Sequence, residues 1–124
     1  MIEITTDRAR LDVDFIHRWL SEEAYWSRGI PRELVARAIA GSLCFGVFDD
    51  GRQIGFARVI TDYATFGYLA DVFVVESHRG RGVAKQIMAA VMAHPELQGL
   101  RRWHLVTRDA HALYAAFGWT PLDA

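Results

Sequence analysis

The stretch from Val72 to Met92 constrains the fold more than any other part of the sequence. An apolar run rich in β-branched residues ends at Val75, a polar turn with two glycines follows, and a helical spacing of apolar residues begins at Val83. Such a turn exposes backbone N–H groups at a helix N-terminus, where the helix dipole also favours negative charge. The stretch therefore predicts a strand, a turn that binds phosphate, and a helix, as in a site for a nucleotide-type cofactor.

The composition limits which anionic partner this turn can serve. The chain has 124 residues, 52% of them hydrophobic, so we expect a single domain over residues 1–124 with a substantial core. Its formal net charge is −1, whereas a general nucleic-acid binder carries a strong basic excess. Arg79 and Arg81 are therefore a local positive charge that suits one small anionic ligand. Because no stretch reads as a membrane span or a signal segment, we expect a cytoplasmic protein that binds no membrane.

Strand and helix patterns alternate along the rest of the chain. Strands are predicted at residues 2–5, 43–48, 53–61, 68–75 and 102–107, and any strand within 119–124 would be short. Helices are predicted at residues 12–26, 31–40, 83–94 and 109–117, with Asp12 and Asp109 as N-caps and Gly118 as the C′ residue of the last. Asp49-Asp50-Gly51-Arg52 is a strong hairpin signal. This order predicts an α/β (α+β) fold in which a mixed sheet carries helices on both faces.

Two short motifs make the chain resemble a known family. Arg79-Gly80-Arg81-Gly82-Val83-Ala84 matches the Arg/Gln-x-x-Gly-x-Gly/Ala signature of the GNAT superfamily of acyl-CoA-dependent N-acyltransferases. Leu113-Tyr114-Ala115-Ala116-Phe117-Gly118-Trp119 is similar to that family's second signature, Leu-Tyr-x-x-x-Gly-Phe. The order of the predicted elements agrees with the family over nearly the whole chain. Without the second motif, the first is also compatible with a plain polar turn between a strand and a helix.

The resemblance implies how acetyl-CoA, as co-substrate, is held. The central sheet would be splayed between the parallel strands 68–75 and 102–107, where a β-bulge interrupts the first of them. The pantetheine arm would lie between these strands and pair with the backbone of Val72, Phe73 and Val74. The pyrophosphate would accept hydrogen bonds from the amides of Gly80, Arg81, Gly82, Val83, Ala84 and Lys85, with charge-assisted contacts from Arg79 and Arg81. Thr107 stands where many relatives hold the arm with an asparagine.

The resemblance also implies the chemistry, which is direct transfer of an acetyl group to a primary amine, here expected to belong to a small molecule. Tyr114 occupies the position of the tyrosine that protonates the leaving thiolate, although a core tyrosine would fit the same helix pattern. Asp71 corresponds to a carboxylate that serves as a base or binds the acceptor, and a structural aspartate is the alternative. Cys44 lies in an apolar run, so a buried inert thiol is expected rather than a covalent relay.

Several further properties stay open at the level of sequence. The same fold would also suit a sensor module that binds acyl-CoA with little or no catalysis. Four aromatic residues, namely Tyr25, Trp26, Tyr63 and Phe66, are candidates for the wall of the acceptor pocket, with core packing as the alternative. The histidines show no metal-ligand spacing, so no metal is expected, and Glu76 and His78 beside the turn are expected to be solvated. Many relatives form homodimers, so a homodimer is also possible.

Overall fold

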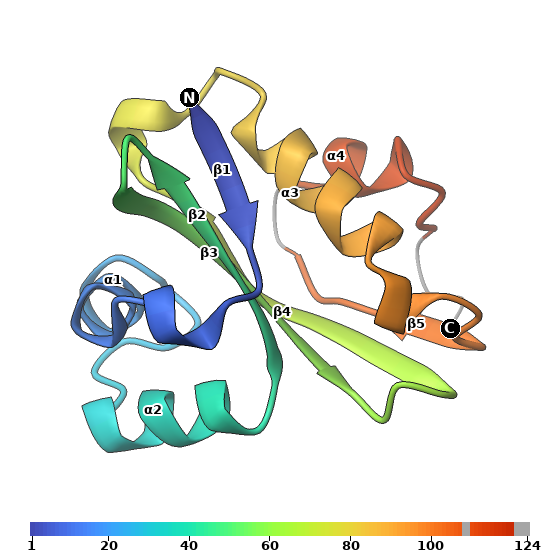
Figure 1. Cartoon of the computed structure of the whole chain (residues 1–124), viewed down its shortest axis with the longest axis horizontal. Helices are drawn as coiled ribbons and strands as arrows, with labels where there is room; N and C mark the ends of the chain where they lie inside the picture. Colours follow the sequence, from blue (N-terminus) through green and yellow to red (C-terminus); the bar gives the residue numbers. More distant parts are fainter. Residues whose placement is uncertain (108–109, 121–124) are drawn as a thin grey trace.

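A computed structural model describes residues 1–107 and 110–120, and within them five strands form one sheet in the order β1-β2-β3-β4-β5 (Figure 1). The strands are β1 (Ile2–Thr5), β2 (Leu43–Asp49), β3 (Arg52–Thr61), β4 (Phe66–Val74) and β5 (Arg102–His104). The helices are α1 (Val13–Glu22), α2 (Arg32–Ala40), α3 (Val83–Ala93) and α4 (His111–Ala115), with short 3-10 turns at Arg8–Arg10, Glu76–His78 and Pro95–Leu97. Neighbouring strands are antiparallel except β4 and β5, which are parallel. The predicted mixed sheet is therefore confirmed.

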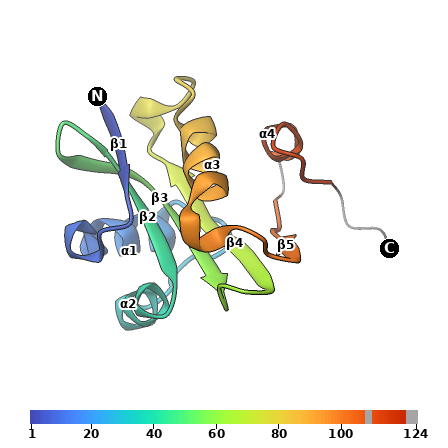
Figure 2. The ribbon, with the colours of Figure 1, turned by 45° about the vertical axis from the view of Figure 1, so that its right-hand side comes forward.

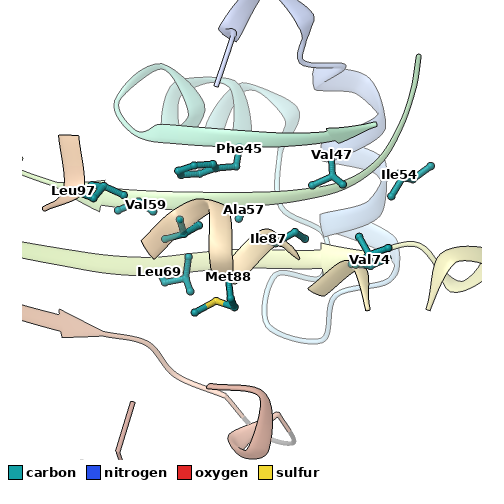
Figure 3. Close-up of a cluster of buried hydrophobic side chains, with 12 residues drawn as sticks. Phe45, Val47, Ile54, Ala57, Val59, Leu69, Val74, Ile87, Met88 and Leu97 are labelled. Atoms are coloured by element: carbon teal, nitrogen blue, oxygen red, sulfur yellow. The ribbon is translucent and has the colours of Figure 1, made fainter. Parts of the chain in front are cut away.

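The helices cover both faces of the sheet, as predicted, and each face has its own core (Figures 1 and 2). On one face α1 and α2 bury Ile16, Leu20, Val35 and Ile39 against Cys44, Phe56 and Phe73. On the other face α3 packs on β2, β3 and β4 (Figure 3), where the buried side chains include Phe45, Val47, Ala57, Val59, Leu69, Ile87, Met88 and Val91. Successive strand residues point to opposite faces, which is why neighbours such as Cys44 and Phe45 serve different cores.

Local signals in the sequence form the predicted turns and caps. Asp12 is the N-cap of α1, and its Oδ1 accepts a hydrogen bond from the Phe15 amide at 3.0 Å. Asp50 and Gly51 connect β2 and β3 with φ values of 51° and 81°, as a type I′ hairpin turn requires. Pro31 is the N-cap of α2, one position before the expected one, because its extended backbone (φ −66°, ψ 144°) already lies outside the helix.

A β-bulge in β4 divides the sheet at its centre. Phe56 pairs with Phe73 while Arg58 pairs with Ala70, so two residues of β4, Asp71 and Val72, lie opposite one residue of β3. Asp71 has a left-handed backbone with φ 54°. The bulge therefore bends β4 at the point where the resemblance placed an interruption.

Strand β5 is shorter than predicted because the sheet is splayed. Its parallel pairing with β4 begins at Phe66–Arg102 and ends at Tyr68–His104. Beyond His104 the described chain no longer pairs with β4, and Oγ1 of Thr107 instead accepts a hydrogen bond from the Ala110 amide at 3.1 Å. The expected strand over 102–107 therefore ends at His104, whereas the expected parting of two parallel strands is confirmed.

The C-terminal helix ends as the sequence indicated. Gly118 has φ 90°, its amide donates to Ala115 O at 3.0 Å, and the Trp119 amide donates to Tyr114 O at 3.2 Å. This is a Schellman cap with Gly118 at C′. The predicted N-cap Asp109 and residues 121–124 of the predicted last strand lie outside the described residues. Within the described part of the chain, no helix is long and apolar enough to cross a membrane.

Candidate active site

The turn before α3 presents open backbone amides. Gly80 and Gly82 have φ values of 75° and 76°, and Gly82 is the N-cap of α3 without a side chain that caps the helix. A Cβ built at either glycine would meet no protein atom within 4 Å, so the space above the turn is open. The left-handed backbone favours glycine at both positions. The uncapped N-terminus of α3 and the two exposed arginines, Arg79 and Arg81, together fit a phosphate group.

Two side chains fix this turn to the strands behind it. Arg79 donates from Nε to Val74 O at 3.0 Å, which ties the turn to the end of β4. Nε2 of His78 lies 2.8 Å from Oδ2 of Asp49, and the His78 side chain is only 16% exposed. This contact corrects the expectation of a solvated histidine. The His78 hydrogen bond holds the pKa of Asp49 below its usual value. No local pattern predicts a contact between residues so far apart in the chain.

At the bulge, Asp71 is held by two donors from different elements. Its Oδ2 accepts from Nε of Arg58 at 2.9 Å, and its Oδ1 accepts from Nε1 of Trp26 at 3.0 Å. The Arg58 and Asp71 side chains are 16% and 14% exposed. Arg58 also donates from Nη1 to Oγ of Ser42 at 3.1 Å. Sequence reasoning missed Arg58, because only the pairing register of β3 and β4 brings it beside Asp71.

A cavity of about 350 Å³ opens beside this ion pair, between α1, α2 and the sheet. Arg58 and Asp71 line it from the sheet side and Arg37 from α2. The rest of its wall is apolar and consists of Leu20, Ile30, Leu34, Val35, Ala38, Ile39 and Phe56. A cavity of this size and lining is typical of a small-molecule site in which a few polar groups fix the orientation of the ligand.

The four aromatic candidates for the acceptor pocket occupy two places. Trp26 contacts Asp71, and the Tyr25 ring stands edge-on to the Trp26 ring, with 5.1 Å between centroids. Tyr63 lies in the loop between β3 and β4, and Phe66 begins β4. Neither Tyr63 nor Phe66 is among the residues that line the cavity. Tyr25 and Trp26 do not line it either, but Trp26 touches the cavity wall through its hydrogen bond to Asp71.

Tyr114 lies on the opposite face of the sheet from the cavity. Its half-buried ring packs against the core beneath α3, and its centroid is 6.1 Å from that of Trp119. Thr107 precedes the same helix, α4. The structure therefore brings the turn before α3, Thr107 and Tyr114 to the α3 side, while Asp71 and the cavity lie on the α1–α2 side. Between them, β4 continues past Tyr68 without pairing to β5, so its edge at Val72, Phe73 and Val74 is open to an extended ligand. Of these groups, the Val74 carbonyl already accepts a hydrogen bond from Nε of Arg79.

Residues 13–119 match the acetyltransferase (GNAT) family. The chain belongs to this family. A protein from Gibberella zeae with a provisional acetyltransferase name is 32% identical over 133 residues, which cover 90% of this chain and 74% of the relative. This GNAT chain is also 60% identical to a crystal structure from Xanthomonas campestris pv. campestris, provisionally described as a GNAT acetyltransferase, with a TM-score of 0.96 over 98% of this chain and 86% of the other.

A more distant GNAT neighbour shares the fold alone. A structure from Clostridium acetobutylicum, described as a predicted acetyltransferase with acetyl-CoA, is 15% identical, with a TM-score of 0.75 over 99% of this chain and 92% of the other.

Among the residues that the structure of the present GNAT chain describes, no three His, Cys, Asp or Glu side chains are grouped so that they could hold a metal ion.

Proposed function

We propose that this GNAT protein transfers the acetyl group of acetyl-CoA directly to a primary amine of a small molecule. The observation that carries the proposal is the open N-terminus of α3, where Gly82 leaves the first-turn amides without a side-chain cap. The acetyl-CoA in the Clostridium acetobutylicum neighbour supports the choice of acyl donor. The apolar cavity beside Asp71 supports a small-molecule acceptor.

The residues that fit acetyl-CoA follow from this arrangement. The amides of residues 80–85 would take the pyrophosphate, with Arg79 and Arg81 adding charge. The backbone of Val72, Phe73 and Val74, which β5 does not pair with, would bind the pantetheine arm. Thr107 would donate its hydroxyl proton to the arm, because its oxygen serves as an acceptor for the Ala110 amide.

Two side chains would handle protons and charge during transfer. The amine nitrogen bonds to the acetyl carbon, the carbon–sulfur bond breaks, one proton leaves the amine and one ends on the thiol. Tyr114 would protonate the departing sulfur. Asp71 would serve as base or as the anion that orients the acceptor amine. Its contacts with Arg58 and Trp26 favour the orienting role, because both carboxylate oxygens already accept hydrogen bonds.

The test is an assay of CoA release from acetyl-CoA with a panel of small primary amines, with the acetylated product identified by mass spectrometry. We expect acetyl-CoA to bind and at least one amine to be acetylated well above background. Tight acetyl-CoA binding without turnover of any amine would instead favour the sensor function. If calorimetry detects no binding of acetyl-CoA, both the acetyltransferase function and the sensor function are excluded.

A homodimer is a separate expectation, which sedimentation of the whole chain tests.

A further inference from the structure

We infer that the acceptor is an α-amino acid with an apolar side chain, whose charged head group binds the Arg58–Asp71 pair. This inference rests on the proposed function and adds the class of acceptor. It follows from the unused hydrogen-bonding capacity of the pair, from the wall of the cavity and from the balance of charge around it.

One nitrogen of the Arg58 guanidinium, Nη2, is available to donate hydrogen bonds to a ligand. Its Nε donates to Asp71 and its Nη1 to Ser42, and among the described residues no acceptor is found for Nη2. Nη2 can therefore donate a charge-assisted hydrogen bond to a carboxylate of the ligand. Because the Arg58 side chain is only 16% exposed, a carboxylate from the ligand would meet it largely shielded from water, where the contact is stronger than at the surface.

Asp71 offers the complementary charge within one hydrogen bond of Arg58. Each of its oxygens accepts one hydrogen bond from the protein, and a carboxylate oxygen has more than one lone-pair site. It can therefore also accept from an ammonium group. A cation and an anion 2.9 Å apart match a ligand whose ammonium and carboxylate are attached to the same carbon.

The remainder of the cavity specifies the body of the ligand. All its other lining side chains are apolar except Arg37. An aliphatic side chain would bury its surface against them, whereas a polar one would lose hydrogen bonds to water without replacing them. The lining carries two arginines and one aspartate, a net charge of +1, which disfavours a polyamine.

The position of the pair also suits transfer. Asp71 belongs to the bulge, directly before Val72, where the edge proposed for the acetyl-CoA arm begins. A head group on Asp71 would therefore place its nitrogen beside that edge of β4, while its side chain points into the α1–α2 cavity.

The test compares four acceptors on the wild-type protein: leucine, leucinamide, isoamylamine and putrescine. The first three share an isobutyl body and differ in the carboxylate. We expect kcat/KM for leucine to exceed that for leucinamide and isoamylamine by at least about tenfold, because only leucine fills the Nη2 donors, and putrescine to be poorest. Equal or better turnover of leucinamide, isoamylamine or putrescine would overturn the inference while leaving the proposed function in place.

A variant pair assigns the selectivity to Arg58. Arg58→Lys keeps a positive charge for Asp71 but removes the guanidinium fork, so the leucine-to-leucinamide ratio should fall to within about threefold. Arg52→Lys makes the same change at an exposed residue of the β2–β3 hairpin and should keep the wild-type ratio. A folded Arg58→Lys protein with the wild-type ratio would refute the assignment to Arg58.

A second readout separates failure of the inference from failure of the proposed function. If no amine is acetylated although acetyl-CoA binds, the proposed function is wrong, and calorimetry of leucine and leucinamide with CoA present still tests the head-group site. Tighter binding of leucine than of leucinamide supports the head-group site. Equal binding of leucine and leucinamide, or no binding of either, refutes it.

Discussion

The guanidinium of Arg58 and the carboxylate of Asp71 lie 2.9 Å apart across the bulge that bends β4. Asp71 has a left-handed backbone, with φ 54°, which is unfavourable for a residue other than glycine, although aspartate and asparagine tolerate it better than most. The hydrogen bonds from Arg58 and Trp26 stabilise this conformation. The pair thus lies between the cavity beside α1 and α2 and the open edge of β4.

Replacing Asp71 tests how much this pair stabilises the fold. Asp71→Asn tolerates the same backbone but leaves the Arg58 charge unpaired in a mostly buried place, so we expect a loss of about 2 kcal/mol in the free energy of unfolding. Urea denaturation measures it. Glu3→Gln breaks the exposed ion pair of Glu3 with Arg10 and should cost less, since surface pairs contribute little. Equal losses for the two variants would contradict the structural role of the Arg58–Asp71 pair.

The sequence predicted most elements and the glycine turn before α3 because their signals are local. Periodic apolar residues predict α3, Asp50-Gly51 predicts the hairpin, and Gly118 predicts the end of α4, each within a few neighbouring positions. The two glycines of the turn before α3 likewise lie next to the helix that they precede. In each of these features, the residue that gives the signal is close in sequence to the backbone whose conformation it determines.

The cavity and its charged pair could not be predicted in this way. Whether Arg58 faces Asp71 depends on the register of β3 against β4, and a bulge changes that register by one residue. The contact of His78 with Asp49 and that of Trp26 with Asp71 also join distant segments. The early end of β5 at His104 could not be predicted for a similar reason. The alternation of apolar and polar residues continues past His104, but it carries no information on where β4 diverges from β5.

Gly82→Ala tests the phosphate turn, with Gly51→Ala as a matched control. Both glycines have left-handed backbones, φ 76° and 81°, and an added Cβ would meet no protein atom within 4 Å at either. Each variant should lose about 1–2 kcal/mol of stability through strain alone. Only Gly82→Ala should also weaken acetyl-CoA binding, because its methyl group stands where the phosphates would approach.

Calorimetry with acetyl-CoA, beside urea denaturation of the same samples, separates the two effects. If both variants bind acetyl-CoA as tightly as the wild type, the turn before α3 is not the phosphate site. If both lose affinity equally, the effect is a general loss of stability.

Tyr114→Phe tests the proposed proton donor. The ring keeps its packing against the core beneath α3, so stability and the KM for acetyl-CoA should change little, while kcat should fall by about a hundredfold. The fall should be smaller at high pH, where the thiolate leaves without a proton. Tyr63→Phe removes a hydroxyl from an exposed residue outside the cavity and should keep the wild-type kcat. Full kcat in Tyr114→Phe would exclude the phenol as the donor.

Cys44 should be chemically inert in the folded protein. Burial raises the pKa of its thiol from 9.0 to about 11, so the reactive thiolate is about a hundredfold scarcer than in the unfolded chain. We expect iodoacetamide to label Cys44 at near-neutral pH only after denaturation. Rapid labelling of the native protein would show that the thiol is accessible and would reopen a covalent relay.

The raised pKa of Cys44 also predicts how stability depends on pH. Because the folded state holds the thiol proton more tightly, this contribution to stability is complete below about pH 9.0 and is lost as the pH rises through about 11. Cys44→Ala lacks the titrating group, so its free energy of unfolding should fall less steeply than that of the wild type over the same range. Urea denaturation series at several pH values measure both slopes. Parallel slopes would mean that the thiol titrates alike in the folded and unfolded chains, and the burial of Cys44 against the α1–α2 core would then have no electrostatic consequence.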